Sequence, residues 1–383
     1  MSMHRGFLAR EGFSMDTLVK VVRTTALNPF VMALPLLLAR YSTMGEKFAI
    51  LHPKAVSRTK LLFYLGVIRW ISGYFSSKVF NNWTDDEYDW QGREIVVVTG
   101  GSSGIGARVV AMLSELGIKV VILDIQSPLT ETGSGVHFFK CDITSTQQIA
   151  STARQIRAKV GEPTVLINNA GVARGKTILD STERDVRFTF DVNALAHYWL
   201  AKEFLPDMIK KNHGMVVTVA SLASWATAPY MVDYAGTKAA ALAFHEGLAA
   251  ELATCYKAPR VRTVVINQGY TKTPLFEGYN NTSPFMLPTL ETDSVAQMIV
   301  EQVLTGRSGQ VIAPAFGSFI SGFSFMPHWY QYKVRRDGHN IMPNWRGKQV
   351  VGDLDKYYED KAKEKTGEEE IDGSAVLVNK DSS

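Results

Sequence analysis

The sequence has few of the residues on which disulfide-rich folds and metal sites depend. Its 383 residues include only two cysteines, Cys141 and Cys255, so a disulfide framework is excluded and a reducing compartment is expected. The chain has no CxxC or HExxH pattern, and His197, His213 and His245 lack metal-ligand spacing. We therefore expect no metal, and structural roles for these histidines.

Apolar segments long enough for a simple membrane span are also missing. Residues 25–39 and 61–75 are apolar, but each is shorter than the roughly 20 residues that a span needs. Pro29, Pro35 and Arg69 interrupt them. Neither resembles a cleaved signal peptide, because the first lies too deep in the chain and no small-residue cleavage site follows closely.

The net charge is small, +4, but it is unevenly distributed. Residues 1–80 contain 11 Lys and Arg against three Asp and Glu, a local charge of +8. A basic segment before a near-neutral body favours a membrane surface over nucleic acid, for which no motif is present.

We expect residues 1–92 to bind a membrane or lipid-droplet surface from the cytosolic side, as an embedded hairpin or as interfacial helices. The basic residues expected at the headgroups are Arg40, Lys47, Lys54, Arg58 and Lys60. A single span over 25–41 and a soluble extension packed on the body are the alternatives.

From residue 93 onward, short Val- and Ile-rich runs alternate with segments of helical periodicity. Continuous apolar runs are typical of strands buried on both faces, and this alternation predicts an α/β fold with a Rossmann-type, doubly wound parallel sheet. About seven strands are predicted, at 94–100, 119–125, 136–142, 163–171, 214–221, 261–269 and 309–314. The expected division is 1–92, a sheet domain at 93–330, and a charged C-terminal extension at 331–383 that is partly disordered.

A glycine-rich turn joins the first strand to the first helix, in VVVTGGSSGIGARVV (96–110). Gly100, Gly104 and Gly106 leave room for a pyrophosphate to approach the backbone at a helix N-terminus, where N–H groups attract anions. Their spacing is GxxxGxG rather than GxGxxG, so the turn alone is a weak indication of a nucleotide site.

Polar residues at the ends of the following strands strengthen that interpretation. Asp124 can accept hydrogen bonds from an adenosine ribose and would repel a 2′-phosphate, and no Arg or Lys lies at 101–105 or 125–127 to attract one. Asp142 could meet the adenine edge, and Asn168-Asn169-Ala170-Gly171 ends the fourth strand. Open α/β sheets bind ligands at this edge. We therefore expect NAD(H) as the cofactor, with NADP(H) as the alternative.

The fifth predicted strand ends at Ser221, and Tyr234 and Lys238 follow on one face of a predicted helix, four residues apart. A free phenol, with a pKa near ~10, is too weakly acidic to act as a base at neutral pH, but a nearby cation lowers that pKa. Tyr234 could then exchange a proton with an alcohol or carbonyl group while Ser221 hydrogen-bonds the reacting oxygen. A surface pair is the structural alternative.

Taken in order, TGGSSGIG, NNAG, Asn193 in FDVNALAHYW, Ser221 and Tyr234-x-x-x-Lys238 resemble the short-chain dehydrogenase/reductase family, over residues 93 to about 315. The resemblance implies a catalytic tetrad of Asn193, Ser221, Tyr234 and Lys238, in which Lys238 also binds the nicotinamide ribose and Asn193 holds a water behind it. The expected cofactor-binding residues are Gly100, Ser102, Ser103, Gly104, Ile105, Gly106, Asp124, Asp142, Asn169, Ala170, Gly171, Tyr234, Lys238, Thr271 and Thr273.

The segment VNALAHYWLAKEFLPDMIKKNHGMVVTVASLAS is similar to the branch of lipid-droplet 17β-hydroxysteroid dehydrogenases and related retinol dehydrogenases, which carry a hydrophobic N-terminal anchor. This resemblance implies an NAD(P)-dependent oxidoreductase of an alcohol or carbonyl group on a lipophilic substrate. It also implies a homo-oligomer at the endoplasmic reticulum or lipid droplet. The alternatives are an NADP-dependent reductase of a lipophilic ketone and a non-catalytic lipid-surface protein.

Two features after the sixth predicted strand bear on the substrate. Asn267-Gln268-Gly269 stands where the family has Asn-Pro-Gly, and Gln268 frees a backbone φ that Pro would fix. Residues 274–290 fall where the family has its substrate loop. The residues expected to line an apolar pocket are Phe276, Tyr279, Phe285, Met286 and Leu287, with ordinary core packing as the alternative.

Overall fold

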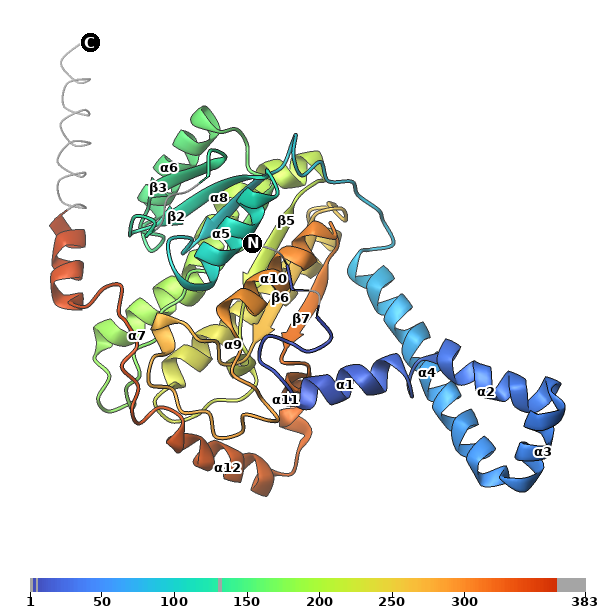
Figure 1. Ribbon diagram of the computed structural model, residues 1–383. Coiled ribbons are helices and arrows are strands. Elements are labelled where there is room, and N and C mark those ends of the chain that lie inside the picture. Colours follow the sequence, from blue (N-terminus) through green and yellow to red (C-terminus); the bar gives the residue numbers. More distant parts are fainter. Residues whose placement is uncertain (1–2, 5, 130–132, 364–383) are drawn as a thin grey trace, which may run out of the picture.

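A computed structural model describes residues 3–4, 6–129 and 133–363; the predicted disorder at the end of the C-terminal extension lies largely outside these residues. One parallel sheet has the strand order β3-β2-β1-β4-β5-β6-β7, which confirms the predicted doubly wound architecture (Figure 1). The strands are β1 (Ile95–Thr99), β2 (Lys119–Asp124), β3 (Val136–Lys140), β4 (Val165–Asn168), β5 (Met215–Val219), β6 (Arg262–Gln268) and β7 (Gly309–Ala313).

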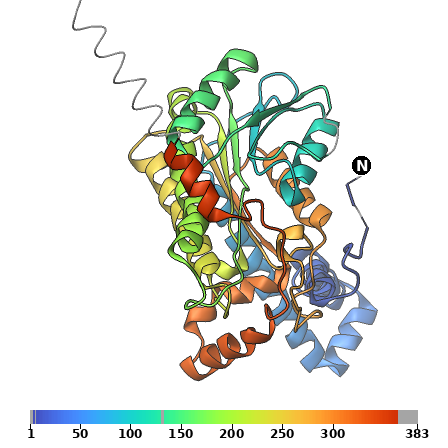
Figure 2. The ribbon, with the colours of Figure 1, turned by 90° about the vertical axis from the view of Figure 1, so that its left-hand side faces the viewer.

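Helices cover both faces of the sheet, as Figure 2 shows. On one face lie α5 (Gly104–Glu115) and α10 (Thr292–Leu304), and on the other α6 (Thr146–Lys159), α7 (Glu183–Phe190), α8 (Ala196–Lys211) and α9 (Val232–Thr254). Successive strand residues point to opposite faces, so Val96 and Val98 of β1 join one core while Ile95 and Val97 join the other. This two-sided burial explains the unbroken apolar runs in the sequence.

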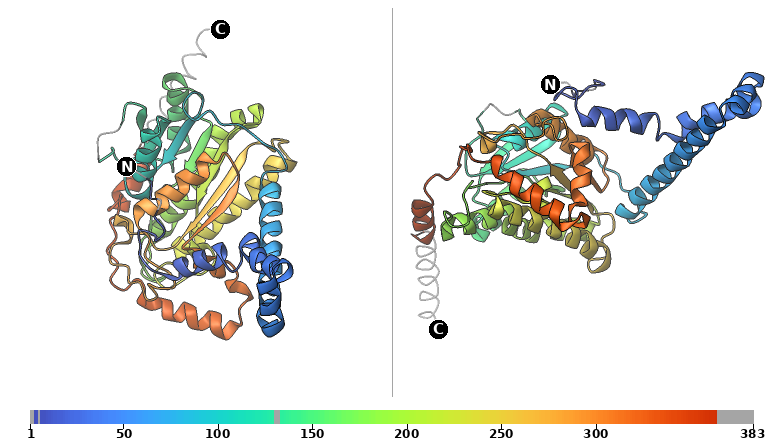
Figure 3. Two further views of the ribbon diagram at one scale, coloured as in Figure 1. Left: turned by 45° about the vertical axis from the view of Figure 1, so that its right-hand side comes forward. Right: turned by 90° about the horizontal axis from the view of Figure 1, so that it is seen from below.

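The N-terminal residues form four helices, α1 (Met15–Thr24), α2 (Pro29–Tyr41), α3 (Thr43–Leu51) and α4 (Pro53–Phe80). Helices α2 and α4 pack together and α3 joins them at the tip, so residues 29–80 form a helical hairpin that extends away from the sheet domain (Figures 1 and 3). Pro29 and Pro53 each occupy the first turn of a helix, where no backbone N–H is needed. Two of the prolines in this region therefore start helices, and Pro35 alone lies within one of the four.

The break between α1 and α2 is stabilised by α4. Both Nε and Nη2 of Arg69 lie 3.4 Å from the carbonyl oxygen of Leu27, which they bond. Gly66 is buried at the same contact, where a Cβ would lie 3.1 Å from that oxygen. Within the described residues no single helix is apolar and long enough to cross a membrane, although α1 and α2 together, bent by 47°, have a suitable length and composition.

The sheet domain and the chain that leads into it are joined by a buried ionic contact. His213, which precedes β5, lies 2.7 Å from Asp86 through Nδ1 and 3.1 Å from Glu94 through Nε2. The hydrogen bond to Glu94 is the main reason why the pKa of His213 is raised. Burial acts to raise the pKa of Glu94, but hydrogen bonds from His213 and Thr164 outweigh it and the pKa is lowered.

We expect this contact to make stability depend on pH. The raised pKa of His213 adds stability below its unfolded pKa of ~6.5, and that gain is lost as pH rises through the folded pKa. The lowered pKa of Glu94 adds stability above 4.5 that is lost as pH falls through the folded value. His213→Gln should therefore lower the free energy of unfolding most between about pH 4.5 and 6.5, by about 1.5–3 kcal/mol, since a hydrogen bond between charged groups is lost while Glu94 keeps those from Arg93 and Asp89.

Urea unfolding from pH 4 to 8 measures this difference. His328→Gln, at an exposed histidine of α12 (His328–Asp337), is the control and should change little. A loss for His213→Gln that is equally large at pH 8 would contradict the ionic origin of the effect.

Candidate active site

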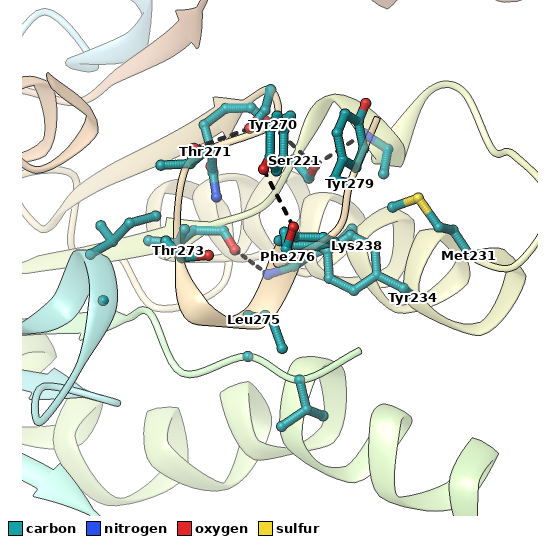
Figure 4. Close-up of a pocket in the computed structure, with 18 of the residues that line it drawn as sticks. Ser221, Met231, Tyr234, Lys238, Tyr270, Thr271, Thr273, Leu275, Phe276 and Tyr279 are labelled. Atoms are coloured by element: carbon teal, nitrogen blue, oxygen red, sulfur yellow. Dashed lines mark hydrogen bonds between the residues drawn. The ribbon is translucent and has the colours of Figure 1, made fainter. Parts of the chain in front are cut away.

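The predicted catalytic and cofactor residues gather around one cavity of about 570 Å³ at the carboxyl ends of the strands. Its volume is in the range of ligand sites, roughly 300–1,000 Å³. Ser221, Tyr234 and Lys238 line it together with residues of the glycine-rich turn and the β6–α10 loop. Figure 4 shows this grouping, with Ser221 following β5, Tyr234 and Lys238 on α9, and the Thr271–Tyr279 segment facing them.

The pair on α9 is buried in the site, so the surface-pair alternative is wrong. Tyr234 and Lys238 are 5% and 3% exposed, and Lys238 Nζ lies 5.7 Å from the centroid of the Tyr234 ring. Lys238 donates a hydrogen bond of 2.8 Å to the carbonyl oxygen of Val219, at the end of β5. The hydroxyl of Ser221 donates to the carbonyl oxygen of Gln268 at 3.2 Å. The end of β5, the helix α9 and the end of β6 are thus joined by hydrogen bonds at the cavity.

Burial dominates the protonation of this pair. It raises the pKa of Tyr234 to about 12, against a lowering influence of the Ser221 hydroxyl. It lowers the pKa of Lys238 to about 8. The pKa of Tyr234 is therefore raised rather than lowered as expected, because burial disfavours the charged phenolate more than the hydrogen bond from Ser221 favours it.

Asn193 lies one layer behind the cavity, in a short π-helix (Asp191–Leu195) between α7 and α8. Its side-chain oxygen accepts from Val172 N and its amide donates to Val172 O, both at 2.8 Å. A Cβ on Gly171 would lie 3.6 Å from Asn193 Oδ1 and 3.7 Å from Lys238 Nζ, so the three are neighbours. The π-helix, a feature often found at functional sites, was not predicted.

The glycine-rich turn comes too close to neighbouring backbone for larger residues. A Cβ on Gly106 would lie 2.2 Å from Gly100 O, and one on Gly100, whose φ is +64°, would lie 2.8 Å from Ala170 Cα. Helix α5 begins at Gly104, so its first N–H groups face the cavity edge, where Gly100, Ser103, Gly104 and Ile105 line the wall. This cradle fits a pyrophosphate, which needs backbone N–H groups and no side chains.

Both carboxylate oxygens of Asp124 are held by the turns beside it. Oδ2 accepts from Ser102 N and Oδ1 from Gln126 N, each at 3.0 Å. Asp124 therefore lines the cavity in a fixed orientation. Ser102 is buried behind it, with its hydroxyl bonded to Gln126 O at 2.6 Å. Ser102 and Gly106 thus shape the turn and are not among the residues that line the cavity.

Asn169 joins the ends of β1 and β4. Its side-chain amide donates to Thr99 O at 3.0 Å and to Gly100 O at 3.2 Å, and the Thr99 hydroxyl accepts from Asn169 N and Ala170 N. Asn169, Ala170 and Gly171 line the cavity at this junction. These positions follow from the sheet topology, because the order of the parallel strands reverses between β1 and β4.

Asp142 lines the cavity where predicted, but its carboxylate already has partners. Oδ1 accepts from the backbone N–H and hydroxyl of Thr144, each at 2.9 Å, and Oδ2 accepts from the Tyr357 hydroxyl at 2.6 Å. Tyr357 also lines the cavity. The expectation that Asp142 meets the adenine edge stays a prediction, and the structure adds that a residue of the C-terminal extension bonds its carboxylate.

Comparison with known proteins agrees with this geometry. Residues 94–284 match the short chain dehydrogenase family. Dehydrogenase RED2 of Cochliobolus heterostrophus is 46% identical over 219 residues, covering 55% of this chain and 82% of that protein. Human estradiol 17-beta-dehydrogenase 11 is 34% identical over 236 residues, covering 60% and 77%. A short chain dehydrogenase from Burkholderia cenocepacia, solved in complex with NADP, superposes with a TM-score of 0.55 at 25% identity, covering 63% of this chain and 96% of that one.

The chain belongs to the short-chain dehydrogenase/reductase family. It falls in the branch of the 17β-hydroxysteroid dehydrogenases. It is an NAD(P)-dependent dehydrogenase or reductase, and the glycine cradle, Asp124 and Lys238 are present and placed to hold the dinucleotide. The chain departs from the family's usual Asn-Pro-Gly at Gln268. This residue continues β6 and pairs with Ala313 of β7. The N–H of the next residue, Gly269, donates to the carbonyl oxygen of Ala313.

The β6–α10 loop supplies the wall opposite the tetrad. The rings of Phe276 and Tyr234 meet edge to face at 5.5 Å, and Tyr270 stacks on Tyr279 at 3.8 Å. Thr271 and Thr273 line the cavity as predicted, as do Phe276, Tyr279 and Leu287.

The prediction that Phe285 and Met286 also line the cavity is not met. Phe285 instead packs on Phe13, and its carbonyl accepts from Met15 N at 2.9 Å. Sequence reasoning missed Tyr270, whose position directly after Gln-Gly could have indicated it. It also missed the cavity residues from the C-terminal extension, for which the sequence gives no local signal: Val334, Asp337, Gly338, Ile341, Lys348, Val350 and Tyr357.

Proposed function

We propose that the protein transfers a hydride between NAD(H) and an alcohol or carbonyl group of a lipophilic, steroid-, retinoid- or lipid-like molecule, with Tyr234 as the acid or base. The supporting observation is that one cavity joins the buried Tyr234 and Lys238 to an aromatic wall of Tyr270, Phe276 and Tyr279. Such a wall offers a large apolar surface and few hydrogen bonds. A relative named for estradiol supports the same substrate class.

In the proposed reaction, Ser221 and Tyr234 have separate roles. When bound, the nicotinamide ring supplies or accepts the hydride. Ser221 hydrogen-bonds the reacting oxygen as charge develops, and Tyr234 gives a proton to a carbonyl or takes one from an alcohol. Because burial raises the pKa of Tyr234 to about 12, oxidation needs the pKa lowered by the cationic cofactor, and its rate should increase as pH rises.

An NADP-dependent reductase of a lipophilic ketone is the second candidate. The Burkholderia relative, which binds NADP, favours it. Asp124 argues for NAD(H), since a fixed carboxylate at the ribose repels a 2′-phosphate. A non-catalytic lipid-surface role does not require the buried tetrad.

Tyr234→Phe should lower the rate of NAD⁺ reduction by lipophilic alcohols about 100- to 10,000-fold, the usual contribution of proton transfer. Cofactor binding should be almost unchanged, because only the hydroxyl is lost. Stopped-flow absorbance of NADH formation with a panel of steroid, retinoid and long-chain alcohols measures the rate. Tyr198→Phe, at a tyrosine of α8 outside the cavity, is the control. A rate for Tyr234→Phe within tenfold of wild type would exclude the proton-transfer role.

Asp124→Ala should weaken NADH binding about tenfold and reduce the preference for NADH over NADPH, because hydrogen bonds to a charged group are lost. Asp124→Asn separates charge from hydrogen bonding, and Ile125→Arg should reverse the preference. Quenching of protein fluorescence by each cofactor gives the dissociation constants. Tighter NADPH binding by the wild type would show that a basic residue elsewhere reaches the phosphate.

Membrane attachment by the helical hairpin is the second part of the proposal. Large apolar side chains on α2 and α4 are exposed, among them Phe30 (72%), Leu34 (60%) and Ile68 (63%). Exposure of this extent is typical of a lipid or protein contact surface. The basic residues Arg40, Lys47, Lys54, Arg58 and Lys60 surround α3 at the tip. A tip in hydrocarbon would bury these charges, at about 2.5–3.5 kcal/mol each, so helices lying at the interface fit better than an embedded hairpin.

Helices α11 (Ser318–Ser321) and α12 lie at the same end of the sheet domain as the hairpin (Figures 1 and 2). Large apolar residues in and around them are exposed, namely Phe319, Phe325, Trp329 and Tyr332. Aromatic residues beside basic ones suit the headgroup region. Both surfaces support attachment to the cytosolic face of the endoplasmic reticulum or lipid droplet. We also propose a homo-oligomer, supported by exposed Leu195 at the end of the π-helix that precedes α8.

Phe30→Glu with Leu34→Glu should shift most of the protein from the vesicle-bound to the free fraction in flotation with phospholipid vesicles. The substitutions place charge on the surface proposed to enter the interface. The matched control is Ile178→Glu with Leu179→Glu, two apolar residues of the sheet domain that are 70% and 96% exposed. Equal release by both pairs, or a wild type that stays free of vesicles, would contradict the proposal.

A further inference from the structure

Part of the C-terminal extension lines the active-site cavity. We name residues 341–361 the C-terminal strap. It follows α12 and lies beyond residues 94–284, which match the family. In Figure 2 it runs from α12 up the face of the body that is turned toward the viewer. Four of its residues line the cavity: Ile341, Lys348, Val350 and Tyr357.

One end of the strap is bonded to the substrate loop. Arg346 N donates to Glu277 O at 2.9 Å, and Lys348 N donates to Pro274 O at 2.8 Å. Gly347 permits this approach, because a Cβ there would lie 1.8 Å from Leu275 O. The contact between strap and loop is therefore made by backbone and needs a glycine.

The middle of the strap is fixed by a buried ion pair. Arg174 is 9% exposed and bonds Asp185 through Nε at 2.8 Å. Its Nη1 donates to the side-chain oxygen of Gln349 at 2.7 Å and to Val351 O at 3.2 Å. This buried guanidinium, bonded through Nε to Asp185 and through Nη1 to the strap, holds the strap in one register.

The far end of the strap reaches the adenosine side of the cavity. The Tyr357 hydroxyl lies 2.6 Å from both Asp142 Oδ2 and Thr144 Oγ1. Its ring packs edge to face on Phe188 at 5.3 Å, and Lys361 Nζ donates to Thr144 O at 3.1 Å. Leu354, 6% exposed, anchors this end in the core beneath α6 and α8.

We propose that Tyr357 is part of the adenosine-binding site, where its ring forms the outer wall and its hydroxyl fixes the Asp142 carboxylate beside the adenine ring. The cavity wall here consists of Asp124, Ile143, Leu129 and Asp142 in addition to Tyr357. A flat base needs an apolar or aromatic surface and few polar groups at its edge, and these residues provide both. Asp142 comes from the family domain, whereas Tyr357 comes from the strap.

The hydroxyl of Tyr357 is suited to this positioning role. Burial and the neighbouring Asp142 carboxylate raise the pKa of Tyr357 well above its usual value, so the phenol stays protonated and donates to Asp142. Thr144 occupies the other carboxylate oxygen. The carboxylate can therefore face the adenine ring in one orientation without first paying the entropy of ordering it.

AMP and nicotinamide mononucleotide, the two halves of the cofactor, test in the full-length protein whether Tyr357 binds the adenosine half. Tyr357→Ala should weaken AMP binding about tenfold and NADH binding to a similar extent, while nicotinamide mononucleotide binds as to the wild type. Tyr357→Phe keeps the ring and should weaken AMP about threefold, the loss expected for one hydrogen bond. Calorimetric titration measures each dissociation constant.

Tyr358→Phe is the matched control, because this neighbouring hydroxyl contacts Asp191 at 3.4 Å and is not among the cavity residues. The Tyr358→Phe variant should leave AMP binding unchanged. Equal thermal unfolding midpoints of the wild type and of the Tyr357 and Tyr358 variants would show that the strap stays docked. Unchanged AMP affinity in folded Tyr357→Ala would overturn the proposal. So would tighter AMP binding by Tyr357→Phe, because Tyr357 would then compete with adenine for Asp142.

Discussion

The junction between β1 and β4 is the contact on which the rest of the structure depends. Strand order reverses there, so the loops after these strands diverge and leave a crevice. The Thr99 hydroxyl and the Asn169 amide join the two strand ends by hydrogen bonds. Gly100 and Gly106 let the turn approach Ala170 and its own backbone. A side chain at Gly100 would collide with Ala170 at the cavity wall, and one at Gly106 would collide with the Gly100 carbonyl and the Asn169 amide, so either would disturb this junction.

The catalytic pair takes its position from the same sheet. Lys238 reaches from α9 to the carbonyl of Val219 at the end of β5, which lies beside β4 in the sheet. The distance between cofactor cradle and reacting groups is thus set by strand spacing, a property that surface loops cannot alter. Burial has a cost, since it raises the pKa of Tyr234 and lowers that of Lys238. The proposed oxidation by Tyr234 would therefore need the positive charge of an oxidised cofactor to favour the phenolate.

Most of this could be predicted from the sequence because it rests on local patterns. Continuous apolar runs marked strands buried on both faces, and the Tyr234 and Lys238 spacing marked one helix face. Features that depend on distant segments could not be predicted. The partner of Asp142 lies 215 residues away, the π-helix at Asn193 depends on contacts to Val172 and Thr237, and the pKa of Tyr234 depends on how completely the fold buries it.

Phe285 shows why composition alone misassigned part of the substrate loop. An aromatic residue there fits a pocket wall equally well, but its ring contacts Phe13 and its carbonyl accepts from Met15 N. Nearby, Asp16 accepts from Ala315 N and Phe316 N, beyond the end of β7. Residues 13–16 therefore join the segment before the hairpin to the substrate loop through a ring contact and a backbone hydrogen bond, and to the chain after β7 through the Asp16 carboxylate. Since hydrogen bonds fix orientation as well as distance, the start of α1 is held against both of these segments.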